Sequence, residues 1–239
     1  MIGDHNYRFM RLFGRFLLSF FDIAVTGYGQ DRLNGIEVPT LIVSNFNSSI
    51  DPLLMTLFFN NPIKCIVEDC VFSNSVLRRI SLKVGNIHIF QNSPNQWGVH
   101  QACTQLTTGN NLLALCPIED PEVPRNTFSL PAYLIHQTGC NFLPVALDGS
   151  AKVLPSGSII PKVHPVRILV GKVETMPKMT DLDGNTTENG LLRKYLIGRI
   201  RALQVVLENT PYDTEPILEP AILPLAPQPI DPEIIVTEK

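Results

Sequence analysis

Residues 44–52 form the part of the chain whose side chains could take part in chemistry. Asn45, Ser48 and Asp51 bring an amide, a hydroxyl and a carboxylate into one short segment, and Phe46 stands among them. A benzyl side chain has no lone pair and no titratable proton, so it cannot act as a general base at any pH. Proton-transfer chemistry in this segment would therefore have to proceed without position 46.

The same segment also has an interpretation that involves no chemistry. Residues 40–43 are a short, mostly β-branched run that predicts a buried strand. Asp51 stands directly before Pro52 and the apolar residues 53–59. Aspartate at an N-cap followed by proline at the first helical position is an ordinary helix start. Taken alone, Asp51 is predicted to cap a helix.

The spacing of Asn45, Ser48, Asp51 and Pro52 resembles the Asn-His-x-Ser-x-x-Asp-Pro motif of the glycerolipid acyltransferases, the 1-acylglycerol-3-phosphate acyltransferase family. Phe46 stands where that motif has histidine. In the family, the imidazole is the general base that takes a proton from the acceptor hydroxyl, and the carboxylate fixes the ring. The resemblance therefore implies a degenerate member in which Asp51 is a vestige and no catalytic residue is expected.

Two further blocks of the resemblance keep their strands but lose the side chains that contact substrate. The family's acid–arginine pair, which closes one strand, is replaced by Phe90 and Gln91. The family's Phe-Pro-Glu-Gly-Thr-Arg segment is replaced by residues 116–121, in which Ile118 is followed by Glu119 and Asp120. These two acids would repel an incoming phosphomonoester.

A fourth block, a strand ending in Pro-Val and followed by Gly-Ser, is retained over residues 142–150, and the resemblance as a whole covers residues 36–174. Strands and turns therefore match, while substrate contacts do not. The resemblance implies a ligand groove formed by seven residues: Asn45, Phe46, Ser48, Asp51, Gln91, Ile118 and Glu119.

Three functions remain open at this point. The first is a catalytically inactive, acyltransferase-like protein that serves as a membrane-associated structural or accessory subunit and could bind phospholipid. The alternative is a divergent, active lysophospholipid (1-acylglycerol-3-phosphate) acyltransferase, supported by the retained Asp51. The third is a soluble α/β domain whose resemblance is accidental. No cofactor is expected, and an acyl thioester donor would be needed only by an active enzyme.

Composition narrows the range of partners and compartments. A net charge of −3 and a pI near 5.9 argue against nucleic-acid binding, which needs a basic face. No histidine stands in a metal-ligand spacing. The five cysteines are odd in number and scattered, which favours a reducing intracellular compartment. No apolar run reaches the 18 residues that span a bilayer, so attachment to a membrane would be peripheral, on a cytosolic face or inside an organelle.

The N-terminal segment, residues 1–30, has the pattern of an amphipathic helix. Arg8, Arg11 and Arg15 lie on the flank of an apolar arc. Such a helix either lies in the headgroup plane and binds membrane lipid, or packs on the core with its arginines in water. The family resemblance favours the membrane. The arc consists of Phe9, Leu12, Phe13, Phe16, Leu17 and Phe20.

Strands and helices alternate through residues 31–210, which predicts an α/β domain with a mainly parallel sheet flanked by helices. Strands are predicted at 40–43, 63–67, 87–90, 112–115, 142–145 and 166–170, and helices at 52–59, 74–84, 95–107, 130–138 and 187–209. Within these helices, Trp97 is predicted to lie in the core. The last helix is predicted to pack through its leucines and to expose its basic residues, Arg199 among them.

Residues 211–239 differ from the rest of the chain. Proline recurs too often for a helix or a central strand, yet aliphatic residues are frequent. We predict an extended arm that binds a protein partner. The alternative is that the arm folds back over its own domain.

Overall fold

The structure is a computed structural model that describes residues 4–33, 39–59, 63–68, 79, 82, 86–89, 97–108, 112–117, 130–155, 158, 160–175 and 187–214. Its strands are β1 (Val25–Tyr28), β2 (Thr40–Phe46), β3 (Lys64–Glu68), β4 (Ile87–Ile89), β5 (Leu112–Pro117), β6 (Asn141–Asp148) and β7 (Val166–Val170). Its helices are α1 (Asp4–Phe20), the short 3-10 helix η1 (Gln30–Leu33), α2 (Asp51–Phe58), α4 (Trp97–Thr107), α5 (Leu130–Thr138), α6 (Ser150–Val153) and α7 (Thr187–Asn209). Apart from Arg79 and Leu82, the helix predicted over residues 74–84 lies outside the described residues.

The seven strands form one sheet in the order β1-β7-β6-β2-β5-β3-β4. Only β6 and β7 pair antiparallel, and the other neighbouring pairs are parallel. This confirms the predicted α/β class with a mainly parallel sheet. All six predicted strands overlap observed ones, and β1 is an additional edge strand that the sequence did not predict.

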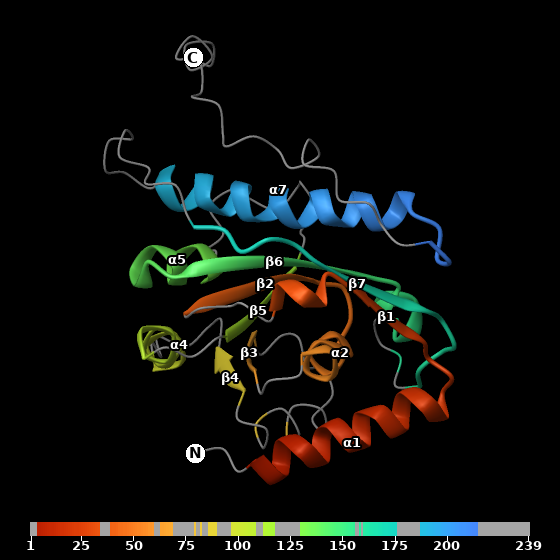
Figure 1. Cartoon of the computed structure of the whole chain (residues 1–239). Helices are drawn as coiled ribbons and strands as arrows, with labels where there is room; N and C mark the ends of the chain where they lie inside the picture. Colours follow the sequence, from red (N-terminus) through yellow and green to blue (C-terminus); the bar gives the residue numbers. More distant parts are fainter. Residues whose placement is uncertain are drawn as a thin grey trace.

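Helices cover both faces of the sheet (Figure 1). Alternation along β2 sends Ile42 to one face and Leu41 and Val43 to the other. On the first face, Ile42 packs in a cluster that includes Leu54 of α2. On the second face, the cluster contains buried residues of α4, α5 and α7, with Phe142 of β6 among its largest side chains. The sheet is therefore buried on both sides, as parallel sheets are.

Two of the predictions for individual helical residues are wrong. Trp97, predicted in the core, is 66% exposed, because it is the first residue of α4 and lies at the end of the helix. Arg199 is buried, because Glu174 reaches α7 and forms an ion pair with it. The leucine face of α7 is confirmed, since Leu196 and Leu207 and their neighbours along that face are buried.

The apolar arc of α1 points away from the core. Phe9, Phe16 and Phe20 are each more than half exposed. Instead, Gly14 faces α2, so closely that a Cβ there would lie 2.9 Å from a methyl carbon of Leu53. Most of this arc is therefore exposed in the described structure rather than packed on the core. In the described part of the chain, no helix is long and apolar enough to cross a bilayer.

Candidate functional site

The topology of the sheet favours a ligand site at the carboxyl ends of β2 and β5. These parallel neighbours are followed by connections that diverge, because α2 packs on one face of the sheet and α5 on the other. In open α/β sheets, ligands bind at such a switch point. The register places Asn45 and Phe46 beside Cys116 and Pro117 at this edge. The first motif of the sequence analysis therefore lies where the fold favours a site.

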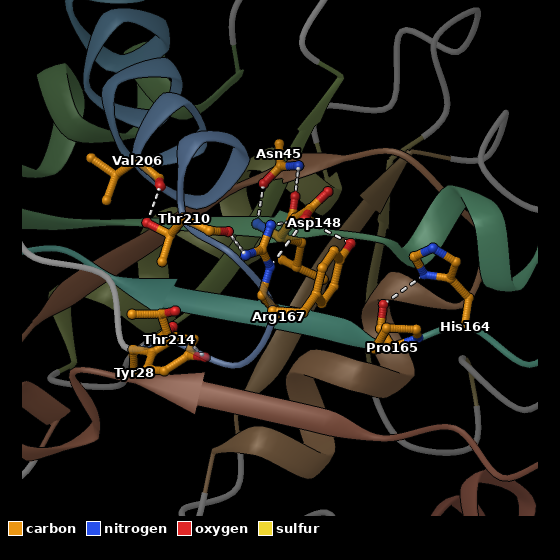
Figure 2. Close-up of polar contacts among 11 residues, drawn as sticks. Tyr28, Asn45, Asp148, His164, Pro165, Arg167, Val206, Thr210 and Thr214 are labelled. Atoms are coloured by element: carbon orange, nitrogen blue, oxygen red, sulfur yellow. Dashed lines mark hydrogen bonds and ion pairs between the residues drawn. The ribbon is translucent and has the colours of Figure 1, made fainter.

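Asn45 is fully buried and bonds to the backbone of β6. Its Nδ2 donates to the Leu147 carbonyl at 2.8 Å, and its Oδ1 accepts from the Leu147 N–H at 2.7 Å (Figure 2). The register of β2 with β6 ends at Ser44 and Val145. The amide thus extends the pairing of the two strands by one step beyond their backbone ladder.

Ser48 and Asp51 close the turn between β2 and α2. Asp51 Oδ2 accepts from the N–H groups of Asn47 at 2.7 Å and Ser48 at 2.8 Å. Ser48 Oγ donates to the carbonyl of Leu154, just after α6, at 2.7 Å. The turn is therefore held both from within and from the neighbouring connection.

The predicted helix cap at Asp51 is wrong. Helix α2 begins at Asp51, its N-cap residue is Ile50, and the Ile50 carbonyl accepts the Leu54 N–H at 3.0 Å. The carboxylate does not bind the free N–H groups of its own helix. It reaches upstream to Asn47 and Ser48, because the turn folds back over the start of the helix.

Burial makes Asp51 an unusual acid. Its side chain is fully buried, and burial raises its pKa from 3.8 to about 6, although the N–H groups of Asn47 and Ser48 and the hydroxyl of Ser150 each lower it. Its second oxygen, Oδ1, has no hydrogen-bond partner among the described residues. The same holds for Oγ of Ser150, which is also fully buried.

Ser150 is the residue that the sequence analysis did not count as part of the site. It begins α6, directly after Gly149, whose φ of 88° lies in the left-handed region. A Cβ on Gly149 would lie 2.3 Å from the Pro165 carbonyl oxygen, so this turn requires glycine. The Gly149–Ser150 pair, which the fourth block of the resemblance retains, was the sequence feature that could have identified Ser150.

The remaining predicted site residues are only partly placed. The backbone of Phe46 ends β2 beside Asn45, and Gln91, Ile118 and Glu119 lie outside the described residues. The structure therefore brings together the Asn45, Phe46, Ser48 and Asp51 positions, and it adds Ser150.

A second polar cluster lies at the end of β6, where Asp148 pairs with Arg167 of β7 (Figure 2). Arg167 is buried, and its Nε and Nη2 donate to Asp148 Oδ2 at 3.2 and 2.6 Å. Its Nη1 donates to the Thr210 carbonyl, and its Cζ lies 3.9 Å from the ring centre of Tyr212. Tyr212 Oη also donates to Asp148 at 3.1 Å. Neighbouring groups thus bind all three guanidinium nitrogens, which leaves this arginine little capacity for an anionic ligand.

Thiol and metal chemistry find little support in the described part of the chain. Burial raises the pKa of Cys65 to about 12 and also raises the pKa of Cys140, so both remain thiols rather than nucleophilic thiolates. No group of three or more His, Cys, Asp or Glu side chains gathers as a metal site within the described ranges. The site is thus a turn organised around one buried carboxyl.

The mainly parallel sheet, the helices on both faces and the turn after β2 define an acyltransferase-like fold. The structure is similar to the crystal structure of the 1-acyl-sn-glycerophosphate (LPA) acyltransferase, PlsC, from Thermotoga maritima, with a TM-score of 0.58 and 15% sequence identity, over 83% of this chain and 79% of that chain. At this identity the likeness shows the fold alone. The sequence matches no protein-family profile and no curated protein.

Proposed function

We propose that this chain is a catalytically inactive protein of acyltransferase-like fold that serves as an accessory or structural protein at a membrane surface. The observation that carries the proposal is Phe46, which ends β2 at the position where the resembling motif has its base. Without a group that accepts the proton of an alcohol, general-base acyl transfer has no starting point.

The surviving motif residues support this proposal because they bind the backbone. Both polar atoms of the Asn45 amide bond to Leu147, and the Ser48 hydroxyl bonds to Leu154. Each role holds strands and turns together and would be needed whether or not the protein turns over a substrate. Retention of these residues therefore indicates a preserved fold rather than a preserved reaction.

Membrane association is part of the proposal, with lipid as the partner. The exposed phenylalanines of α1 form an apolar row, and Arg8 and Arg15 are exposed on the same helix. Such a helix suits the boundary between headgroups and acyl chains. We also propose that residues 211–239 bind a protein partner, since their aliphatic content suits a contact surface. A reducing compartment fits the free thiols of Cys65, Cys103 and Cys140.

The alternative is a divergent, active lysophospholipid acyltransferase. The buried Asp51, with one oxygen free of partners among the described residues, is the observation in its favour. An aspartate poised in this way could orient a base supplied by another part of the chain.

An acyl-transfer assay separates the two functions. Purified wild-type protein is incubated with an acyl thioester and 1-acylglycerol-3-phosphate, beside an active enzyme as the positive control. We expect no turnover above that of Asp51→Ala. Turnover by the wild type that Asp51→Ala abolishes, while the variant keeps the circular dichroism of the wild type, would overturn the proposal.

The companion variant Phe46→His tests what else is missing from the site. We expect the added imidazole to restore little or no turnover, because Gln91 and Glu119 stand at the positions where the resembling motifs have phosphate contacts. Restored turnover that the double variant Phe46→His/Asp51→Ala loses would show that the base was the only missing part.

A further inference from the structure

The connection between α6 and β7 carries exposed apolar side chains beside exposed cations. Ile160 is 65% exposed and Val163 is 70% exposed. Lys162 stands between them and is exposed, as is Lys152 of α6. The sequence over residues 149–166 contains no acid. Isolated exposed apolar residues are common on protein surfaces, so the neighbours of this pair decide what it can bind.

This connection and α1 lie on the same face of the sheet. Val153, the last residue of α6, and Leu154 belong to the core cluster of the α2 face, and Leu18 of α1 packs against the same cluster. The two segments meet where the Val166 N–H donates to the Ala24 carbonyl at 2.8 Å, at the start of the β1–β7 pairing (Figure 1). The connection therefore lies next to the end of the helix that carries the exposed phenylalanines.

Hydrogen bonds hold the connection in place before any ligand binds. The Lys162 N–H donates to the Val153 carbonyl at 2.7 Å, and Ser158 Oγ donates to the Ile160 carbonyl at 3.1 Å. Pro161 restricts the backbone between Ile160 and Lys162. Such preorganisation reduces the conformational entropy that a contact surface loses on binding.

The charge of this surface complements an anionic bilayer. On α1, the turn after it and the α6–β7 connection, the exposed charged residues that the structure describes are four cations and one acid: Arg8, Arg15, Lys152, Lys162 and Asp22. Apolar side chains beside cations suit the boundary between acyl chains and anionic headgroups. A single helix on a bilayer can roll about its axis, whereas a second contact beside its end fixes the orientation of the domain.

We propose that Ile160, Lys162 and Val163 form a second membrane contact, which binds the surface of an anionic bilayer together with α1. This proposal rests on the membrane role proposed for α1 and adds a second point of attachment. Ser48 Oγ donates to the Leu154 carbonyl at 2.7 Å, so the candidate turn is bonded to the start of the same connection. Docking through both contacts would fix the orientation of that turn relative to the bilayer.

Flotation tests the second contact on vesicles of phosphatidylcholine with phosphatidylglycerol. We expect Ile160→Ser/Val163→Ser to bind about tenfold more weakly than the wild type, because two side chains no longer enter the bilayer. Lys152→Gln/Lys162→Gln should also bind about tenfold more weakly on these vesicles. On phosphatidylcholine alone, the lysine variant should bind as the wild type does.

The matched control for flotation is Val173→Ser/Val205→Ser, which removes two exposed valines outside the connection. Val205 belongs to α7, which packs on the opposite face of the sheet from α1. This variant should bind as the wild type does. A loss equal to that of Ile160→Ser/Val163→Ser would show a general effect of lost apolar surface and would overturn the second contact.

Fluorescence quenching reads the contact directly, even if the changes in affinity are small. Trp97 is the single tryptophan of the chain, so Trp97→Phe provides a background without indole. Val163→Trp in this background should be quenched by phospholipids with brominated acyl chains. Val205→Trp in the same background should not be quenched.

The outcomes separate this proposal from the proposed function. A wild type that floats, with undiminished flotation of Ile160→Ser/Val163→Ser and an unquenched Val163→Trp variant, would overturn the second contact, leave the role of α1 intact and point to a protein as the occupant of this surface. A wild type that does not float would defeat the membrane role itself and the second contact with it.

Discussion

The side-chain amide of Asn45 takes the place of a peptide group between β2 and β6. Its donor and its acceptor both meet Leu147, one step beyond the last backbone pair of the two strands. Asn45 is fully buried, so both bonds lie away from solvent in the folded protein. The residue therefore matters for stability whether or not the site has any activity.

Asn45→Ala should destabilise the protein by roughly 3 kcal/mol, because it leaves the buried N–H and C=O of Leu147 unpaired. Urea unfolding measures the change. The matched control is Asn141→Ala in β6, the strand of Leu147. Among the described residues, the Asn141 side chain accepts one bond, from the exposed Thr175, so the variant should cost less than about 1 kcal/mol. Equal costs for the two variants would contradict this role.

At this scale, the sequence indicates which residues belong together but not which atoms bond. Spacing placed Asn45, Ser48 and Asp51 in one frame, and the structure brings them together. The upstream bonds of Asp51 are local, but they depend on the conformation of the turn, which the spacing does not specify. The burial of Arg199 was not predictable, because it depends on Glu174, a partner that the tertiary fold delivers. Ser150 was missed for the same reason, since it is distant from Asp51 along the chain.

Helix α1 owes its orientation to Gly14. The absence of a side chain there lets the helix approach Leu53 and Leu57 of α2 closely, while the phenylalanines of the helix are exposed. Phe9 and Phe13 stack at 6.3 Å between ring centres, as do Phe16 and Phe20 at 6.0 Å. The exposed face therefore carries two stacked pairs of aromatic rings.

Replacing Phe9, Phe16 and Phe20 together by serine should abolish binding to vesicles that contain anionic phospholipid, because the row supplies the buried apolar area. Liposome flotation measures binding. The matched control replaces Val173 and Val205, exposed apolar residues elsewhere, and should bind as the wild type does. Retained flotation of the triple variant would argue against the membrane role of α1.

Among the elements, long periodic segments were predictable and short ones were not. The apolar period of α7 gave its range and its buried face, because many residues repeat the same signal. Strand β1 spans only Val25–Tyr28 and contains Gly27, so it has too few apolar residues to give a strand pattern in the sequence. The antiparallel pairing of β6 with β7 depends on how the chain returns after α6, which periodicity does not encode.

At the scale of the whole molecule, the residues that follow α7 contact β7 and β1, at the edge of the sheet opposite β4. The Thr210 carbonyl and the Tyr212 side chain both contact Arg167, and Tyr28 Oη lies 3.5 Å from the Thr214 carbonyl (Figure 2). Residues up to 214 thus belong to the domain, and the segment predicted to bind a partner starts from a fixed point. Its binding, in cis or in trans, stays a prediction.

Two truncations distinguish the predicted arm from the contacts that Thr210 and Tyr212 make with Arg167. A chain that ends at Thr214 should unfold within about 0.5 kcal/mol of the full chain, because every described contact of Arg167 remains. A chain that ends at Asn209 should lose about 2 kcal/mol, since Arg167 loses Thr210 and Tyr212. Co-purification with the Thr214 truncation then tests the arm in a stable domain. Undiminished recovery of partners would contradict a partner-binding arm.

The order α1 then β1 has a mechanical consequence. Ile23 is buried between them, and β1 lies parallel to β7 from Val25 and Val166 to Tyr28 and Leu169. If α1 is bound to a bilayer, a force applied to the domain along the direction of β1 loads the β1–β7 hydrogen bonds in shear. These bonds must then break together rather than one at a time. Strand β1, which no sequence pattern predicts, would then transmit the force between the membrane-bound helix and the rest of the domain.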